Sequence, residues 1–228
     1  MTIDSILTEL HSHQSSAVLA GQKRFGIANE TGLGVSVPIL RAMAKKIGKS
    51  QPLSIELWNT NIHEARLLAS MIGVPTEITE KQFDDWTTDF DSWDICDMTC
   101  SNLFDKTPFV VDKIFEYALR KEEFVKRTAF ALMATYAVHA KNVNNEIFEQ
   151  FLPLIEREAC DDRNFVKKAV NWGLRQIGKR NLYLYEKANE CAIQVAKQSS
   201  KSAQWIARDA LREFSEEKII ERIKQKSV

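Results

Sequence analysis

Apolar residues recur along the chain at intervals of three and four, the spacing that places them on one face of an α-helix. Between positions 125 and 136, for example, apolar side chains stand at Val125, Ala129, Leu132, Met133 and Tyr136. The strict alternation of apolar and polar residues that marks a half-buried strand is absent. The pattern therefore predicts an all-α protein built of roughly a dozen helices.

Residues typical of helix ends separate these apolar stretches. Residues that favour helix starts are Thr79, Asp91, Thr107 with Pro108, and Asp161 or Asp162. Residues that favour helix ends are Gly48, Gly73, Asn142 and Gly178. The turns between them are short, and no linker is long enough to divide the chain. We therefore predict a single domain over residues 1–228.

A weak internal repeat has a period near 40 residues. The segment 124–127 (FVKR) recurs at 165–168 (FVKK) and, more loosely, at 205–208 (WIAR). A period of this length with two helices per unit is typical of HEAT or armadillo-like repeats, in which each helix pair packs on its neighbours. We predict an α-α superhelix of HEAT-like helical repeats, a curved solenoid with a concave face. An ordinary helical bundle is the alternative.

Composition places the chain among folded proteins without membrane spans. Of its 228 residues, 44% are hydrophobic and 27% charged, which excludes disorder. No segment approaches the roughly 20 apolar residues of a membrane span, and the first ten residues do not resemble a secretory signal. We therefore expect a cytoplasmic protein. The four cysteines lack CxxC or zinc-ligand spacing, so we interpret them as reduced packing residues.

The net charge of zero hides an uneven distribution. Residues 77–116 carry 3 basic and 11 acidic side chains, whereas residues 157–228 carry 16 basic and 10 acidic ones. Within 163–180 there are six cations and no acid. Such a block can bind a polyanion, although a solvated helix face is the more common explanation of a charge run.

Two predicted helices combine aromatic and charged residues on one face. Trp93 and Asp97 are four residues apart, which places an indole and a carboxylate on the same side of a helix, with Asp94 on the adjoining face. In the second helix a basic stripe contains one aromatic residue and is formed by Lys168, Trp172, Arg175 and Lys179. The structural alternative is that Trp172 fills a gap and that Asp97 pairs with a nearby lysine.

A third predicted helix carries Arg127 above two small residues, Ala131 and Ala134. We expect this spacing to let the guanidinium reach outward. An ordinary surface cation is the alternative.

Three of these segments carry a resemblance to a known family. Residues 93–97 (WDICD), 126–129 (KRTA) and 168–175 (KAVNWGLR) resemble motifs of the DNA alkylation repair proteins built of HEAT-like repeats, in particular the AlkD type of alkylpurine DNA glycosylase. The resemblance extends through residues 24–25 (RF), 34–38 (GVSVP) and 40–41 (LR), and so covers most of the chain.

The resemblance implies a role for individual residues. It places Trp93 on the family's sugar-facing tryptophan, Asp97 on its catalytic aspartate and Trp172 on its second tryptophan. Arg127 matches the arginine that holds the DNA backbone near the lesion. Phe25 stands where the AlkD type has a tyrosine that completes the aromatic pocket, so the hydroxyl is missing here.

What the resemblance implies is an enzyme that binds duplex DNA on its concave face. It would hydrolyse the N-glycosidic bond of cationic N3- or N7-alkylated purines, without base flipping and without metal or organic cofactor. The chemistry of the residue types agrees, because a carboxylate stabilises the positive sugar left when a cationic base departs. We expect a monomer with no membrane partner, and DNA contacts by Phe25, Arg127, Lys168, Arg175 and Lys179.

Two alternatives remain open at this point. The chain could bind damaged or branched DNA without excising a base, or it could be a HEAT-repeat scaffold that binds a protein. An acidic cluster next to Asp97 opposes a polyanion and is formed by Asp84, Asp85, Asp89, Asp91 and Asp94. On the concave face these residues would favour the scaffold, and on the convex side they would matter little. The four histidines lack ligand spacing, so we assign no metal.

Overall fold

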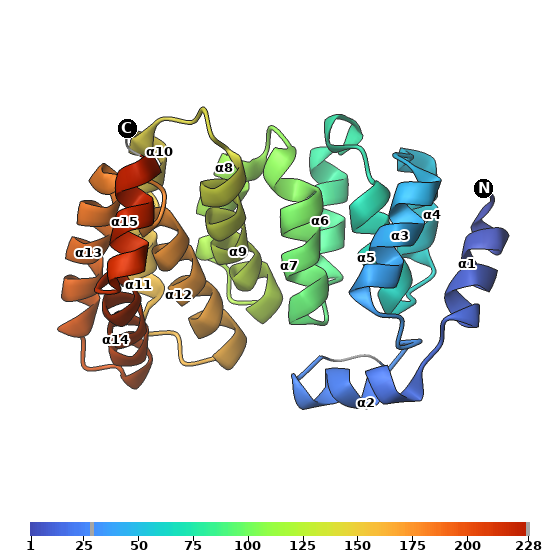
Figure 1. Cartoon of the computed structure of the whole chain (residues 1–228), viewed down its shortest axis with the longest axis horizontal. Helices are drawn as coiled ribbons and strands as arrows, with labels where there is room; N and C mark the ends of the chain where they lie inside the picture. The colour runs from blue at the N-terminus through green and yellow to red at the C-terminus, as the bar shows by residue number, and fades with distance from the viewer. Residues whose placement is uncertain (28–29, 227–228) are drawn as a thin grey trace. The chain divides into compact units, whose positions relative to one another are not determined.

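The computed structural model describes residues 1–27 and 30–226, and within them every regular element is a helix (Figure 1). This confirms the all-α prediction. The chain forms two compact units, Met1–Pro108 and Phe109–Val228. The single domain over residues 1–228 stays a prediction.

The first unit is centred on α5. Its elements are α1 (Ile3–Ser12), α2 (Ser16–Arg24), α3 (Val37–Ile47), α4 (Gln51–Asn59), α5 (His63–Ile72), η1 (Pro75–Glu77), α6 (Glu80–Thr88), α7 (Trp93–Asn102) and η2 (Phe104–Lys106). Helix α5 packs against α3, α4 and α7, and all its residues except Met71 are buried. Stacked aromatic rings join the neighbouring helices, with Trp58 of α4 and Trp86 of α6 3.9 Å apart at their centroids.

The second unit contains the repeat seen in the sequence. Its elements are α8 (Val110–Ala118), α9 (Glu123–His139), α10 (Asn145–Glu149), α11 (Leu152–Glu158), α12 (Asn164–Gly178), α13 (Leu182–Ala196), α14 (Lys201–Phe214) and α15 (Glu217–Lys226). Residues 124–127 lie at the start of α9, residues 165–168 at the start of α12, and residues 205–208 near the middle of α14. Their second residues, Val125, Val166 and Ile206, are all buried. The same register therefore recurs on successive helices, as the period predicts.

Helix α2 differs from the others in the first unit. In Figure 1 it runs crosswise to α3, α5 and α7, and none of its residues is buried. Its start is attached to the loop before α3, where the Ser15 amide donates to the Leu33 carbonyl over 3.0 Å. Gly34, with φ +77°, lies against the Ser15 carbonyl, and a Cβ at this position would come within 2.1 Å of that oxygen. The loop geometry thus needs glycine here.

Several helix ends lie where the sequence indicated. Thr79 caps α6 by accepting from the Gln82 amide, while Gly48, Gly73 and Gly178 fall at the ends of α3, α5 and α12. Pro38 stands in the first turn of α3.

Three predicted ends are wrong by one to three residues. Helix α8 starts at Val110 rather than after Thr107, and α9 ends at His139 rather than near Asn142. Helix α7 starts at Trp93, but Ser92 rather than Asp91 directly precedes it. Helix α12 starts after Arg163 because Asp161 accepts from the Arg163 amide and guanidinium and so belongs to the preceding loop. Capping residues therefore mark these ends only approximately.

Three of the four cysteines are buried, as predicted, but Cys160 is exposed, so that prediction is wrong for this residue. Burial raises the pKa of the Cys191 thiol to about 12, which keeps it protonated. In the described part of the chain, no helix is long and apolar enough to cross a membrane.

Candidate functional site

A cavity of about 390 Å³ in the first unit brings Trp93 and Asp97 together. Its lining comes from α2, the loop before α3, α3, α5 and α7, and consists of Val18, Gln22, Ile27, Val35, Ser36, Val37, Leu67, Trp93, Asp94, Asp97 and Met98. Most of these side chains are apolar. The four-residue spacing predicted that Trp93 and Asp97 share a helix face, and the structure places both in the lining of this cavity.

Trp93 also connects two elements of the cavity. Its indole Nε1 donates to the Phe25 carbonyl at the end of α2, over 3.1 Å. Because Ser15 holds the other end of α2 on the Leu33 carbonyl, α2 is attached at both ends to the body of the unit. The α2 wall of the cavity is therefore fixed partly by Trp93 itself.

Asp94 holds the first turn of α7 in place. Its carboxylate accepts from the Ser92 hydroxyl (2.5 Å) and the Ile95 amide (3.0 Å), and pairs with His63 Nε2 at 2.9 Å. Burial by itself lowers the pKa of His63, but the hydrogen bond and charge of Asp94, with the charges of Glu64 and Asp91, outweigh it and raise the pKa above its usual value. The pair connects α5 to the first turn of α7, three residues before Asp97.

The neighbouring Glu64 builds the loop on the opposite side of the cavity. Although fully buried, its carboxylate accepts from three backbone amides, those of Leu33, Gly34 and Val35, at 2.8, 2.7 and 3.2 Å. A carboxylate that receives several backbone N–H groups is well compensated for its burial. Glu64 therefore fixes the chain segment that supplies Val35 and Ser36 to the lining.

The acidic cluster is partly neutralised within the first unit. Asp85 pairs with Lys81 at 2.6 Å, and Asp94 pairs with His63. Asp89 accepts from the Trp58 indole at 3.0 Å and lies 3.7 Å from the Arg66 guanidinium. These partners reduce the opposition to a polyanion that the sequence suggested.

Phe25 does not line the cavity, in contrast to what the resemblance implies for this position. Its side chain is 73% exposed, while Gln22 and Ile27 supply the lining on either side of it in the sequence. The cavity is therefore closed here by an amide and an aliphatic side chain.

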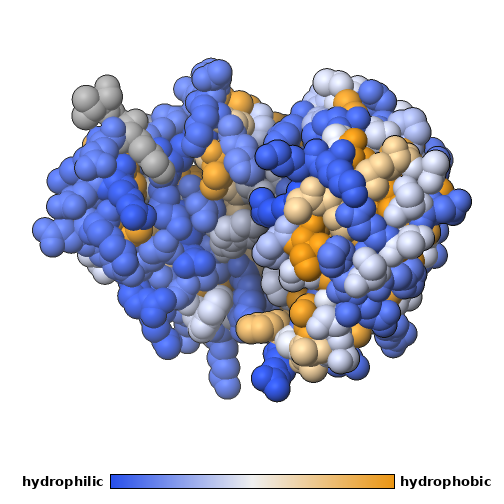
Figure 2. Space-filling view, turned by 45° about the vertical axis from the view of Figure 1, so that its right-hand side comes forward, coloured by the Kyte–Doolittle hydropathy of each residue, from blue (hydrophilic) through white to orange (hydrophobic). Residues whose placement is uncertain are grey.

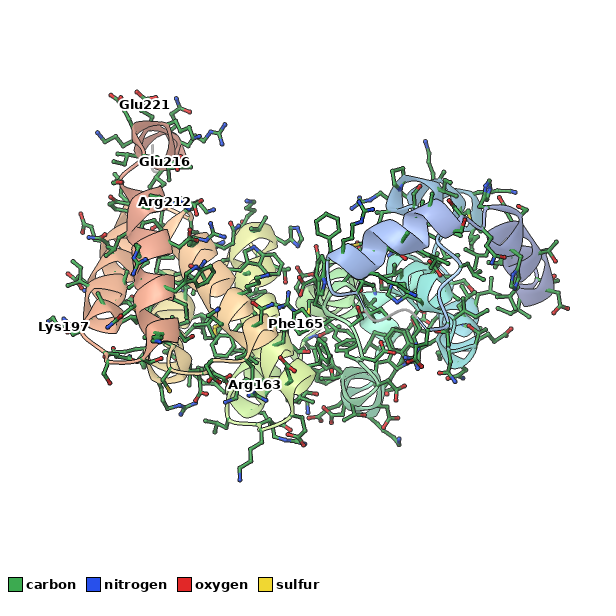
Figure 3. All side chains as sticks on the ribbon, turned by 90° about the horizontal axis from the view of Figure 1, so that it is seen from below. Arg163, Phe165, Lys197, Arg212, Glu216 and Glu221 are labelled. Carbon is green, nitrogen blue, oxygen red and sulfur yellow. The ribbon has the colours of Figure 1, made fainter. Side chains whose placement is uncertain are left out.

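In the second unit, the expectation that Arg127 reaches outward is wrong. Its side chain is buried, and the guanidinium donates to the Phe165 carbonyl at 2.5 Å. The small residues Ala131 and Ala134 are buried against neighbouring helices and leave no open space. Arg127 thus joins α9 to the first turn of α12, where Figure 3 shows Phe165 and Arg163.

The basic stripe on α12 lies on the face opposite the buried one, as predicted. Lys168 is exposed and Trp172 is half-buried. Arg175 pairs with Glu213 at 2.6 Å and with Asp209 at 3.5 Å, and Lys179 pairs with Glu213 at 2.5 Å. Burial tends to raise the pKa of Glu213, but Lys179 and Arg175 lower it overall. Carboxylates of α14 therefore hold two of the four stripe residues.

The sequence reasoning missed the buried charged residues at the start of α5. His63, Glu64 and Arg66 are all buried, and Arg66 donates to the Asn61 side chain (2.6 Å) and the Asp89 carbonyl (3.2 Å). Their burial could have been expected from the sequence, because they stand in a segment whose other residues are nearly all apolar. Among the described residues, no group of three or more His, Cys, Asp or Glu side chains is placed to hold a metal ion.

The repeated register of α9, α12 and α14 is typical of a protein built of HEAT-like repeats. Comparison with known proteins gives the family. The sequence profile described as DNA alkylation repair enzyme matches residues 6–214, so the chain belongs to that family. No curated protein sequence matches it significantly.

Two solved structures are similar to the chain. One is described as belonging to a new family of proteins related to the HEAT-like repeat DNA glycosylases with affinity for branched DNA structures. It is 20% identical, the match covers 100% of this chain and 99% of that one, and the TM-score is 0.78. The second is a designed armadillo repeat protein in complex with a (KR)4 peptide, 12% identical over 81% of this chain and 88% of that one, with a TM-score of 0.37. The first comparison shows that the fold is shared.

Proposed function

We propose that the protein binds duplex DNA and hydrolyses the N-glycosidic bond of cationic N3- or N7-alkylated purines. The observation that carries this proposal is the placement of Trp93 and Asp97 in one apolar cavity of the first unit. Membership of the DNA alkylation repair family supports it.

The reaction needs only one carboxylate beside the sugar. Alkylation at N3 or N7 gives the purine a positive charge, so the base leaves without a strong general acid. Positive charge then develops on the sugar, and the Asp97 carboxylate stabilises it and positions the attacking water. An apolar lining strengthens this attraction because it lowers the local dielectric constant. The Trp93 ring adds an aromatic surface that attracts cationic groups.

Asp94 is unsuited to that role although it lines the same cavity. Its two oxygens already accept from Ser92 and Ile95 and pair with His63. We assign Asp94 the positioning of α7. We assign catalysis to Asp97 because the segment 93–97 (WDICD) matches it to the family's catalytic aspartate.

In the second unit, we expect Lys168, Arg175 and Lys179 to bind DNA phosphates. Lys168 is exposed, and the other two share the same helix face. Arg127 acts indirectly in this account, by holding the first turn of α12 through the Phe165 carbonyl. The role that the resemblance gives to Trp172, as a second aromatic wall, stays a prediction.

The experiment is release of 3-methyladenine and 7-methylguanine from alkylated duplex DNA. The wild type is expected to release base, and Asp97→Asn to lose at least about 100-fold in rate. Asp91→Asn is the matched control, because Asp91 is an exposed carboxylate outside the cavity lining. Equal losses in the two variants would assign the effect to net charge rather than to catalysis by Asp97.

A second candidate function is binding of branched or damaged DNA without excision. The solved structure with a TM-score of 0.78 favours it, because its family is described as having affinity for branched DNA structures. A wild-type protein that binds alkylated and branched DNA yet releases no base would establish this second candidate and exclude the first.

A further inference from the structure

Phe25 is the most exposed large apolar side chain in the described part of the molecule. It is 73% exposed, against 60% for Leu119 and 51% for Met1. A single exposed apolar residue is common on protein surfaces and needs no explanation by itself. The surroundings of Phe25 distinguish it from such a residue. In the space-filling view, apolar side chains interrupt the polar surface of the forward-facing first unit in patches (Figure 2).

The backbone that carries Phe25 is held firmly. Its carbonyl accepts from the Trp93 indole at 3.1 Å, and its amide donates to the Gln22 carbonyl at 3.0 Å. The next residue, Gly26, has φ +71°, and its amide donates to the Lys23 carbonyl at 3.1 Å. The ring therefore projects from a well-held helix end. The backbone carbonyl of Phe25 is bound by Trp93, which also lines the cavity.

Two cations directly precede the ring. Lys23 and Arg24 are exposed, and neither forms an ion pair with a side chain that the structure describes. The end of α2 thus presents an apolar ring next to two positive charges. Gln22 and Ile27, on either side of this tip in the sequence, line the cavity that holds Asp97.

This combination fits a DNA step in which a base pair is opened or unstacked. Apolar side chains inserted between base pairs are a common device of DNA-bending proteins, and flanking cations bind the adjacent phosphates. We propose that Phe25, with Lys23 and Arg24, forms a wedge that inserts into the DNA base stack beside the cavity. This inference rests on the proposed DNA binding and adds the part of the DNA that is recognised.

Insertion has a consequence for the choice of DNA. Unstacking a step costs a few kcal/mol in an intact duplex and less at a branch point, where stacking is already interrupted. The wedge therefore favours DNA with a branch point over an intact duplex of the same length. Lys23 and Arg24 contribute to both, because phosphate contacts do not depend on stacking.

The test measures binding to a three-way junction and to an intact duplex, with 2-aminopurine placed at the branch point. Wild-type protein is expected to bind the junction more tightly and to raise the fluorescence of the probe as its neighbour is unstacked. Phe25→Ala is expected to bind the junction about tenfold more weakly and to give no rise in fluorescence. Its affinity for the duplex should change by less than about twofold. Phe25→Trp should retain both properties.

Leu119→Ala is the matched control, because it removes an exposed apolar side chain from the second unit. Circular dichroism melting checks that each variant is folded. If Phe25→Ala binds the junction as tightly as the wild type and raises the fluorescence equally, the wedge is overturned while DNA binding stands. If the wild type binds neither DNA, the proposed function fails and the wedge fails with it.

Discussion

Asp94 and Asp97 are three residues apart on α7, yet their surroundings differ. Asp94 accepts from Ser92 and pairs with the buried His63, and Asp97 lines the cavity one turn further along. The sequence placed the two on adjoining faces and could not separate their roles. The separation depends on His63 and Ser92, whose side chains meet Asp94 only in the folded chain.

The pair of His63 and Asp94 predicts a pH-dependent contribution to stability. Because the folded-state pKa of His63 is raised, the pair stabilises the protein fully below the unfolded pKa of about 6.5. That contribution is lost as pH rises through the raised folded pKa. We expect His63→Gln to lower the free energy of unfolding by about 1–3 kcal/mol at pH 6 and by less at pH 9. Chemical denaturation of both proteins across this range measures it, and a pH-independent difference would contradict it.

Glu64 predicts a larger, local effect. Removing its carboxylate leaves the amides of Leu33, Gly34 and Val35 without their acceptor in a buried loop. We expect Glu64→Ala to lower the free energy of unfolding by about 2–4 kcal/mol. The control Glu56→Ala, an exposed carboxylate on α4, should change it by less than about 0.5 kcal/mol. Similar values for the two variants would show that the loop does not depend on Glu64.

At the scale of elements, the attachment of α2 depends on one glycine. Gly34 and Gly48 have nearly the same φ, +77° and +78°, but a Cβ at Gly34 would meet the Ser15 carbonyl at 2.1 Å and one at Gly48 meets nothing within 4 Å. Gly48→Ala should therefore cost about 1–3 kcal/mol from backbone strain alone, because φ 78° with ψ −172° is a region that essentially only glycine adopts. Gly34→Ala should cost clearly more and increase amide exchange within α2. Equal losses of stability would show that the start of α2 is not packed on this loop.

The contact between α12 and α14 predicts a gain in DNA binding. Glu213 holds both Arg175 and Lys179, so it competes with phosphate for these cations. We expect Glu213→Gln to raise duplex affinity about three- to tenfold at low salt. The exposed Glu186→Gln, on α13, removes the same charge without freeing either cation and is the control. Fluorescence anisotropy distinguishes them, and equal gains would indicate a general charge effect.

Helical periodicity predicted the elements better than their ends. The buried face of α12 was correct because apolar residues at three- and four-residue spacing have one way to be buried on a helix. The residues that precede α7 and α12 were wrong, because Ser92 and Arg163 stand there rather than the nearby aspartates. A capping aspartate and a loop aspartate look alike in the sequence, since tertiary partners decide between them.

At the scale of the whole molecule, the repeat period and the motifs gave the fold and the family, and the family match over residues 6–214 confirms the latter. They also predicted that Trp93 and Asp97 share a helix face, because a four-residue spacing fixes that face. The cavity that both residues line depends on α2, α3 and α5, which the spacing does not describe. They did not give the burial of Arg127 or the pairing of Arg175 with Glu213. Both depend on which helix packs against which, and a single helix pattern does not contain that information.

Catalysis of base release by Asp97 can be tested by one paired measurement. Single-turnover release of 7-methylguanine and binding of the same DNA are measured for the wild type and Asp97→Asn. We expect release by the wild type and a rate at least about 100-fold lower for Asp97→Asn. DNA affinity should be unchanged or increased, because the substitution removes a negative charge. Release by Asp97→Asn at the wild-type rate, or tight binding by the wild type without any release, would contradict it.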